Sequence, residues 1–489
     1  MRPQLSTGND KAPGSIQSPP RHNITRTRSG STESAGSISS LGRDRGLSMS
    51  SSQNKSLLHL RGTQKKLVLG MVGLPARGKT YISKKVSRYL TWTGYNCQVF
   101  NIGSYRRKLF GADKSNEFFD PDNLQGVEQR KQCAIAALED MIKYFASGGH
   151  AAVYDGTNST SSRRQMIMEY LEREGEHLGM KIEVVWIESI CNDPEIIEAN
   201  VRETKLTSPD YIGASASTAE ADFMQRIRQY EKAYETLPAE ADYPFVKIVD
   251  VGRQVITNQI YGYLMGKITH YLMNLRPNKC PIYITRHGES MHNLRGLIGG
   301  DSDLSPNGRA YGQALADFIH SEQFHEDDVD ELTVWTSTLR RTIETASYLN
   351  IPTVQWRALI EIQVGICEDM TYADIEERYP AEWAARKRDK LRYRYPQGES
   401  YMDVVQRVEP VIFELERMQA PVLLIVHRAV ARCLLSYFAD YDQHDIPHLE
   451  VPLHTLLKLE PKAYGCDIKT HKLDIPSVED EGPHVQTSS

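Results

Sequence analysis

Two groups of residues, far apart in the sequence, have types and spacings suited to phosphate chemistry. Residues 73–80 match G-x-x-x-x-G-K-[ST] and end in Lys79 and Thr80. In such loops, backbone N–H groups and a helix N-terminus hold the phosphates of a nucleoside triphosphate; the lysine reaches the β- and γ-phosphates, and the hydroxyl joins the shell of Mg²⁺. The second group is an R-H-G-E sequence at residues 286–289, with His427 after a later apolar run. The first group predicts transfer of phosphate from ATP, and the second predicts removal of phosphate.

The nucleotide loop needs a carboxylate on the metal side, and Asp155 is the candidate. It directly follows the apolar run 151–154, so it is expected at the carboxyl end of a strand, facing the water shell of Mg²⁺. The alternative is an ordinary loop aspartate with a structural role. The expected metal ligands are Thr80 and Asp155. The expected nucleotide contacts are Gly73, Leu74, Pro75, Ala76, Arg77, Gly78, Lys79, Thr80 and Tyr81.

Several arginines follow the expected ends of strands in the same half of the chain. Arg106 and Arg107 come after one strand, and Arg163 and Arg164 come after Asp155. Ligands of open α/β sheets bind at the carboxyl edge of the strands, and guanidinium groups bind phosphate oxygens in pairs. Any one of these arginines could simply be solvated. Together they predict a phosphorylated small molecule as the acceptor.

The second group predicts covalent catalysis by histidine. A neutral imidazole, that of His287, would attack phosphorus, while Arg286, Arg341 and His427 would stabilise the negative charge of the transferred group. A carboxylic acid must then protonate the leaving alkoxide, and Glu361 is the candidate. A single histidine at a strand end is more often structural, but two histidines with two arginines favour a catalytic site.

Hydrophobic patterning predicts the elements that position these residues. Buried strands are expected over 66–72, 98–102, 151–154, 182–187 and 245–249, with helices over 79–93, 127–145, 194–206 and 220–237. A second series has strands at 282–285, 332–335 and 422–426. Strands that alternate with helices predict two α/β domains, the first with a mostly parallel sheet. No internal repeat relates the two halves.

Composition suggests boundaries and excludes some classes of protein. We expect a disordered Ser/Arg-rich tail over 1–60, domains over 61–278 and 279–466, and a loose polar tail over 467–489. Arg-x-x-Ser sequences at Ser29 and Ser48 suggest phosphorylation by a protein kinase; a solvated tail without this role and a transit peptide are the alternatives.

The bulk properties favour an enzyme of a reducing compartment. The net charge of −5 argues against nucleic acid as a partner, and no apolar run is long enough for a membrane span. The seven cysteines form no C-x-x-C pair, which is typical of a reducing compartment, so a cytoplasmic location is expected.

With these motifs in view, residues from about 62 to 466 resemble the bifunctional 6-phosphofructo-2-kinase/fructose-2,6-bisphosphatase family. The resemblance is carried by stretches 71–85, 188–197, 293–296 and 452–455. It implies a P-loop kinase domain followed by a histidine-phosphatase domain of the phosphoglycerate-mutase-like α/β fold. It also implies ATP and Mg²⁺ as cofactors, and fructose 6-phosphate and fructose 2,6-bisphosphate as substrates. A homodimer is the expected assembly.

The resemblance also implies roles for individual residues. In the kinase half it assigns fructose 6-phosphate contacts to Arg106, Arg130, Thr157, Arg163, Lys205, Arg226 and Tyr230, and a catalytic role to Lys79, Asp155 and Lys205. In the phosphatase half it makes His287 the nucleophile and Glu361 the proton donor, with Arg286 and His427 beside them. The contacts to the bisphosphate that it implies are Arg286, Asn293, Gly299, Arg341, Tyr372, Arg386, Lys390, Tyr401 and Arg432. Arg428 is expected beside them, although it departs from the family's usual sequence. Cys191 matches a cysteine of the family's kinase site, although a buried core cysteine is the favoured interpretation.

The chain departs from the family's usual sequence at three positions near the phosphatase site. It has Gln363 and Val364 where Asp-Ala is usual, and Arg428 where Gln is usual. These changes shift the local charge toward positive, which should strengthen the binding of anions, including product phosphate. The main interpretation is a bifunctional enzyme that makes and degrades fructose 2,6-bisphosphate. The alternatives are a kinase with a weakened phosphatase domain, and a metabolite-sensing regulatory protein without turnover.

Overall fold

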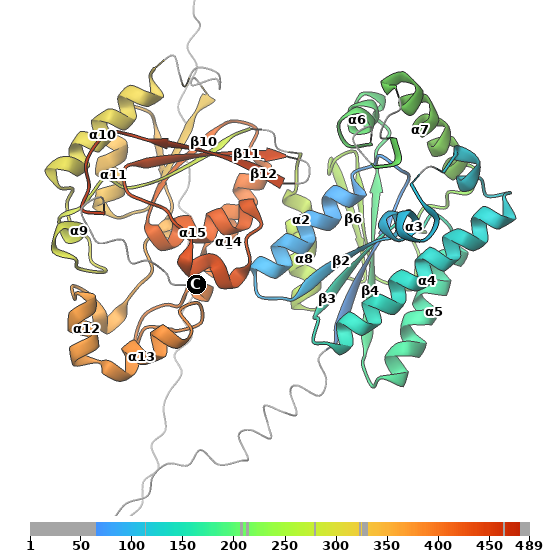
Figure 1. The fold of residues 1–489 in the computed structure, drawn as a ribbon, viewed down its shortest axis with the longest axis horizontal. Helices are drawn as coiled ribbons and strands as arrows, with labels where there is room; N and C mark the ends of the chain where they lie inside the picture. Colours follow the sequence, from blue (N-terminus) through green and yellow to red (C-terminus); the bar gives the residue numbers. More distant parts are fainter. Residues whose placement is uncertain are drawn as a thin grey trace, which may run out of the picture. The chain divides into compact units, whose positions relative to one another are not determined.

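The computed structural model describes residues 65–479, apart from residue 113 and the segments 206–208, 212–214, 278–279, 322–323, 325–330 and 463–464. All of these residues fall within one unit, 58–489, which holds two six-stranded sheets (Figure 1). The predicted N-terminal tail, Ser29, Ser48 and the boundary at 278 lie outside the described residues.

The first sheet has the strand order β2-β3-β1-β4-β5-β6. The strands are β1 (Lys66–Val72), β2 (Cys97–Asn101), β3 (Ala151–Asp155), β4 (Ile182–Ile190), β5 (Phe245–Val249) and β6 (Gln254–Asn258). Only the pairing of β6 with β5 is antiparallel. All seven residues of β1 are buried, as expected for a central strand covered on both faces by helices. The mostly parallel sheet is therefore confirmed, and the edge strand β6 was not predicted.

Helices join these strands, as the alternating pattern predicted. They are α2 (Lys79–Trp92), α3 (Ile102–Phe110), α4 (Leu124–Ala146), α5 (Ser161–His177), α6 (Pro194–Asn200), α7 (Ala216–Glu231) and α8 (Tyr263–Asn274), with 3₁₀ turns η1 (Asn116–Phe119) and η3 (Pro209–Tyr211). The helix expected over 194–206 is shorter: after α6 it continues as a π-helical turn, η2 (Val201–Lys205). The sequence reaches Pro209 soon after η2, and a proline disfavours a helix that continues through it.

The second sheet has the order β12-β11-β7-β10-β8-β9. Its strands are β7 (Ile282–Arg286), β8 (Thr333–Thr336), β9 (Thr353–Gln355), β10 (Val422–Val426), β11 (Thr455–Lys462) and β12 (Gly465–Lys472). β11 runs antiparallel to both β7 and β12, and the other pairings are parallel. The prediction of a loose tail is therefore wrong for residues 467–472, which belong to β12. β12 looked like a tail because an edge strand with a solvated face is polar.

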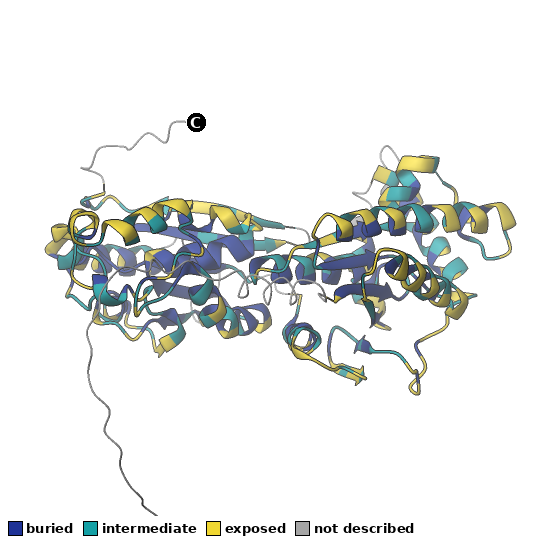
Figure 2. Cartoon of the chain, turned by 90° about the horizontal axis from the view of Figure 1, so that it is seen from below, coloured by how far each residue is buried: buried dark blue, intermediate teal, exposed yellow. Residues whose placement is uncertain are grey.

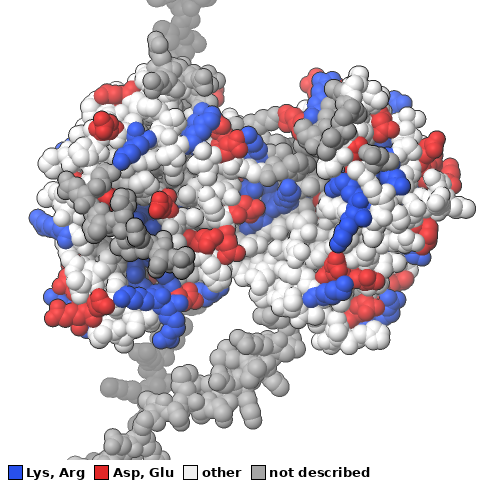
Figure 3. Space-filling model, in the orientation of Figure 1, with Lys and Arg blue, Asp and Glu red and all other residues white. Residues whose placement is uncertain are grey.

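The helices of the second half follow its strands in the same way. They are α9 (Met291–Arg295), α10 (Pro306–Ile319), α11 (Arg340–Ser347), α12 (Tyr372–Arg378), α13 (Pro380–Arg388), α14 (Tyr401–Arg417) and α15 (Arg428–Ala439), with 3₁₀ turns η5 (Arg357–Leu359), η6 (Gly365–Cys367) and η7 (Gln443–His448). Figure 2 shows the central strands of both sheets buried beneath helices whose outer faces are exposed. On the face drawn in Figure 3, acidic and basic side chains are interspersed. Among the described residues, no helix has the length and apolar character needed to cross a membrane.

A buried ion pair connects α2 of the first half to α14 of the second. Lys85 Nζ lies 2.6 Å from Glu416 Oε1, and the two side chains are 7% and 2% exposed. The hydroxyl of Tyr437 donates to the same carboxylate at 2.6 Å. Nearby, Trp92 Nε1 donates to the carbonyl of Cys433 on α15 at 2.9 Å. Helix α2, which begins at the nucleotide loop, is thereby fixed against α15, which begins beside His427.

Removing one partner of this pair should be more harmful than removing both. We expect Lys85→Met to lower the stability of the chain by about 3–5 kcal/mol, because it leaves the Glu416 carboxylate buried without its cation. The double variant Lys85→Met/Glu416→Leu should recover most of this loss. Denaturant midpoints would measure both effects. Lys143→Met, which removes a solvent-exposed pair with Asp140, is the control and should change little. Equal destabilisation by the single and double variants would contradict this account.

Candidate active sites

The nucleotide loop connects β1 to α2, and its glycines adopt backbone conformations that other residues rarely adopt. Gly73 has φ 137° and Gly78 has φ 75°, both in a region that favours glycine. A Cβ at Gly73 would also collide with the carbonyl oxygen of Ser189 on β4. Gly78 is the N-cap of α2 and provides no side-chain cap. The first N–H groups of α2 can therefore serve the phosphates of a nucleotide.

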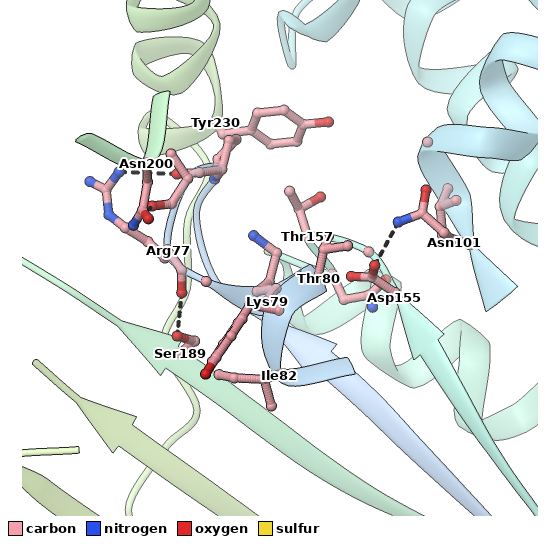
Figure 4. A pocket seen from close by; sticks show the side chains of 18 of the residues that line it. Arg77, Lys79, Thr80, Ile82, Asn101, Asp155, Thr157, Ser189, Asn200 and Tyr230 are labelled. Atoms are coloured by element: carbon pink, nitrogen blue, oxygen red, sulfur yellow. Dashed lines mark hydrogen bonds between the residues drawn. The ribbon is translucent and has the colours of Figure 1, made fainter. Parts of the chain in front are cut away.

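Lys79, Thr80 and Asp155 line one pocket at the carboxyl edge of the first sheet (Figure 4). Lys79 is 8% exposed, and its ammonium group donates to the carbonyl of Leu74 at 2.5 Å. Asp155 Oδ2 accepts from the side-chain amide of Asn101 at 2.5 Å. Because Asn101 and Asp155 are paired in register on β2 and β3, this hydrogen bond fixes the carboxylate near the loop. Asn101 was not predicted as a site residue.

The predicted sugar-phosphate residues line the same pocket. They are Arg106, Arg130, Thr157, Arg163, Arg226 and Tyr230. Arg163 Nη2 donates to the carbonyl of Arg130 at 3.0 Å, and the guanidinium of Arg226 lies 3.7 Å from the centre of the Phe119 ring. For Lys205 the structure gives only the backbone, in η2; its side chain lies outside the described part of the chain.

A carboxylate that sequence reasoning missed lies among these arginines. Arg106 Nη2 lies 2.5 Å from Asp210 Oδ2, and Arg226 Nη1 lies 3.5 Å from the same oxygen. Burial opposes ionisation of Asp210, but Arg106 and the neighbouring arginines outweigh it and lower the pKa of this carboxyl. Burial and Arg226 lower the pKa of Arg106. No sequence pattern pointed to Asp210, although it follows Lys205, a predicted site residue, by five positions.

Cys191 and the β11–β12 hairpin of the second half also line this pocket. Cys191 is 5% exposed and packs among apolar side chains that include Phe223, as favoured from the sequence. The hairpin contributes residues 461–462 and 465–467. No sequence pattern indicated that this hairpin reaches the first site.

The two histidines meet at the carboxyl edge of the second sheet. Val426 pairs with Arg286 in register, so His287 and His427 leave neighbouring strands at the same level, and their ring centres are 5.1 Å apart. The Nδ1 of His287 lies 2.7 Å from the carbonyl oxygen of Gly288. A proton on Nδ1 therefore donates to this carbonyl, which leaves the Nε2 lone pair for attack on phosphorus.

Electrostatics keep both imidazoles neutral. Burial, with the charges of Arg341 and Arg286, lowers the pKa of His287 well below its ordinary value. Burial and Arg341 likewise lower the pKa of His427. His427 Nε2 lies 2.8 Å from the hydroxyl of Ser337, and its Nδ1 has no hydrogen-bond partner among the described residues. His427 can therefore direct a polar atom at a transferred phosphoryl group.

Glu361 lies at the N-terminus of α15. Its Oε1 accepts from the backbone N–H of Ala429 at 3.1 Å and from that of Ile362 at 2.9 Å. Arg341, 5% exposed on α11, donates to the carbonyl of Gly300 at 2.8 Å.

The residues expected to contact the bisphosphate lie in two places. One set consists of cationic side chains near tyrosine hydroxyls, and the other lies at α9 and the loop that follows it. Arg386 donates to the hydroxyls of Tyr395 and Tyr372, at 2.8 and 3.3 Å. Arg432 Nη1 donates to the hydroxyl of Tyr401 at 2.9 Å. Burial, with nearby Arg432, Arg386 and Arg428, lowers the pKa of Lys390 to about 8. Asn293, the third residue of α9, instead accepts from the N–H and hydroxyl of Ser290, the N-cap of that helix, and Gly299 lies in the following loop with φ 73°.

The residues after β12 place a carboxylate on the predicted catalytic arginine. Arg286 Nη1 lies 2.9 Å from Glu479 Oε1, and Arg428 Nη1 lies 3.6 Å from the same oxygen. The positive charge expected from Arg428 is therefore partly balanced by Glu479. Arg428 is about half exposed, and Gln363 is exposed whereas Val364 is buried. Glu479 belongs to the predicted loose tail, so no sequence pattern pointed to it.

Comparisons with known proteins agree with both halves of the chain. Residues 54–279 match the family model for 6-phosphofructo-2-kinase, and residues 282–474 match the histidine phosphatase superfamily, branch 1. The rat protein named 6-phosphofructo-2-kinase/fructose-2,6-bisphosphatase 4 is 50% identical over 411 residues, which cover 83% of this chain and 85% of that protein. The human protein named 6-phosphofructo-2-kinase/fructose-2,6-bisphosphatase 1 is 50% identical, over 83% of this chain and 84% of that protein.

A solved structure, the alpha-ribazole phosphatase from Shigella flexneri, matches with 21% identity and a TM-score of 0.36, over 40% of this chain and 98% of that one. The relatives match at half of all aligned positions across both sheets, and both family models match in the expected order. The chain therefore belongs to the 6-phosphofructo-2-kinase/fructose-2,6-bisphosphatase family.

Proposed function

We propose that this chain phosphorylates fructose 6-phosphate with ATP at one site and hydrolyses fructose 2,6-bisphosphate at the other. The observation that carries the proposal is that two complete phosphate-handling sets, around Lys79 and around His287, lie at the carboxyl edges of separate sheets in one chain. Its family membership supports both activities. Steady-state assays of the two reactions on the purified full chain test it.

The kinase reaction transfers the γ-phosphoryl group of ATP to a sugar hydroxyl. Lys79 and the N-terminus of α2 bind the phosphates, and the arginines beside Asp210 bind the phosphate of fructose 6-phosphate. Mg²⁺ fits this site, because the Thr80 hydroxyl and the Asp155 carboxylate line one pocket and Mg²⁺ usually takes few protein ligands besides phosphates and water. When bound, Mg²⁺ neutralises charge on the β- and γ-phosphates.

The phosphatase reaction runs through a phosphohistidine. Nε2 of His287 attacks phosphorus, the bond to the sugar oxygen breaks, and Glu361 gives that oxygen its proton as fructose 6-phosphate leaves. Water then attacks the phosphohistidine, Glu361 takes a proton from it, and phosphate is released. Arg286, Arg341 and His427 stabilise the charge of the transferred group. The low pKa of His287 supports this role, because only the neutral ring attacks.

The proposal extends to the assembly, location and regulation of the chain. We propose a homodimer in the cytoplasm, with a protein kinase acting at Ser29 or Ser48. The alternatives predict different assays: a weakened phosphatase gives kinase turnover with little hydrolysis, and a metabolite sensor gives neither. The presence of intact Lys79, His287 and Glu361 favours turnover at both sites.

Lys79→Ala should abolish the kinase reaction and leave hydrolysis nearly unchanged. Lys79 stabilises charge in the transition state, so kinase turnover should fall by at least about 10²-fold. The two rates would be measured on the same preparation, with Lys143→Ala, a solvent-exposed lysine, as the matched control. A folded Lys79→Ala chain that has lost both activities would contradict the independence of the two sites.

His287→Ala should prevent formation of the covalent intermediate. Phosphate label from fructose 2,6-bisphosphate should be trapped on the native chain in acid-labile, base-stable form, as expected for phosphohistidine. The exposed His444, changed to alanine, is the control and should retain the label. Undiminished label on His287→Ala would refute the assignment of the nucleophile.

Hydrolysis should weaken as the pH rises through 8, because Lys390 has a pKa of about 8. Below this pH its ammonium group is charged and attracts the bisphosphate; above it the charge is lost, so kcat/KM should fall. Lys390→Arg, which stays charged, should remove that fall. Profiles of kcat/KM from pH 6 to 9 measure the effect. The same alkaline fall in both proteins would show that Lys390 is not its cause.

A further inference from the structure

The segment that carries Glu361 has little regular structure of its own. It runs from the short turn η5 through residues 360–364 to the turn η6. A proton donor on such a segment needs external contacts, because a catalytic carboxyl works only at the correct distance from the leaving oxygen. The contacts of Glu361 itself, with the N–H groups of Ile362 and Ala429, fix its carboxylate but not its backbone.

One arginine holds the backbone before Glu361. Arg407, on α14, donates from Nη1 to the carbonyls of Ala358 and Ile360, at 2.7 and 3.0 Å. Its remaining donors form a two-pronged ion pair with Glu399: Nε to Oε1 at 2.8 Å and Nη2 to Oε2 at 2.9 Å. The two side chains are only 19% and 17% exposed, so water competes weakly with these contacts.

The partner of this arginine holds the backbone after Glu361. Glu399 Oε2 accepts from the N–H of Gln363 at 3.0 Å, and the N–H of Glu399 donates to the carbonyl of Gln363 at 2.8 Å. The Arg407–Glu399 pair therefore holds the chain at residues 358, 360 and 363, on both sides of Glu361. A lysine could not replace this arginine fully, because it lacks the planar fork that serves both carbonyls and the carboxylate.

We propose that Arg407 and Glu399 are positioning residues of the hydrolysis reaction, which act through Glu361 by fixing the backbone on either side of it. This inference rests on the proposed function, in which Glu361 protonates the leaving sugar oxygen. Removing the Arg407–Glu399 pair should leave the nucleophile His287 in place and displace the carboxyl group of Glu361. The loss should therefore appear when the leaving group needs a proton and be small when it does not.

The test follows formation of the phosphohistidine in a single turnover with two substrates. With fructose 2,6-bisphosphate, the sugar oxygen of fructose 6-phosphate leaves as an alkoxide that needs a proton. With p-nitrophenyl phosphate, the leaving group is the stable p-nitrophenolate ion, which does not. Arg407→Gln should slow the reaction of the bisphosphate about tenfold or more, out of the 10²–10⁴-fold that a general acid contributes, and should slow that of p-nitrophenyl phosphate little. Arg407→Lys should be intermediate, and Glu399→Gln, which retains an acceptor for Gln363, should be milder than Arg407→Gln.

The decisive comparison combines Arg407→Gln with Glu361→Gln. If Arg407 acts through Glu361, the double variant should react with the bisphosphate no more slowly than Glu361→Gln alone. Arg417→Gln is the matched control: it removes an ion pair with Glu414 on the same helix, at a side chain that is 56% exposed, and should change neither reaction. The kinase rate of each preparation should be unchanged, which would show that the first half is folded. An unchanged reaction with p-nitrophenyl phosphate would show the same for the half that carries His287.

Three results would overturn the inference. Additive losses in the double variant, or equal slowing of both substrates by Arg407→Gln, would show that the pair supports the site in general and does not act through Glu361. No loss from Arg407→Gln would remove its role altogether. If Glu361→Gln itself fails to slow the bisphosphate, the assignment of the proton donor in the proposed function fails, and the inference fails with it.

Discussion

Both sites depend on holding several buried cations close together, such as Arg106 at the first site and Arg286 and Arg341 at the second. Such an arrangement is costly unless opposite charges or neutral partners compensate, because each buried charge loses its hydration. The first site meets this constraint with Asp210, which lies against Arg106 and Arg226. The second meets it with Glu479 beside Arg286, and with histidines that stay uncharged. Neutral imidazoles are also what nucleophilic attack on phosphorus requires, so a single electrostatic constraint serves stability and chemistry.

The parts of these sites that follow strand ends could be predicted from the sequence. Lys79, Asp155, His287 and His427 each come directly after an apolar run or the loop that follows it, and parallel strands bring their carboxyl ends to one edge. The expected strands agree with the observed ones to within a few residues. Four strands were not predicted: β6, β9, β11 and β12. β6, β9 and β12 lie at sheet edges, and edge strands with a solvated face lack a continuous apolar pattern. β11 lies inside the second sheet, but its apolar run is interrupted by Lys458, Glu460 and Pro461.

The contacts that complete the sites could not be predicted, because they join residues whose proximity only the fold determines. Glu479 reaches Arg286 only because β11 and β12 return the chain to the edge of the second sheet. Arg407 meets Ala358 and Ile360 only because α14 packs beside the segment that carries Glu361. Neither residue belongs to a local motif, and a surface arginine or a tail glutamate is the ordinary interpretation of each. The contacts of Asn101 with Asp155 and of Ser337 with His427 could not be predicted for the same reason.

The packing of α2 on α14 and α15 has a consequence for any attempt to divide the chain. Trp92, Tyr271 and Tyr437 are each 3% exposed or less, and their contacts cross from one half to the other. A phosphatase half produced alone would present Tyr437 and the unpaired Glu416 to solvent, and a kinase half alone would present Trp92 and Lys85. Either fragment would carry a new apolar, charge-unbalanced surface prone to self-association. Either half produced alone would therefore need polar replacements at this surface before its solubility or activity could be compared with those of the intact chain.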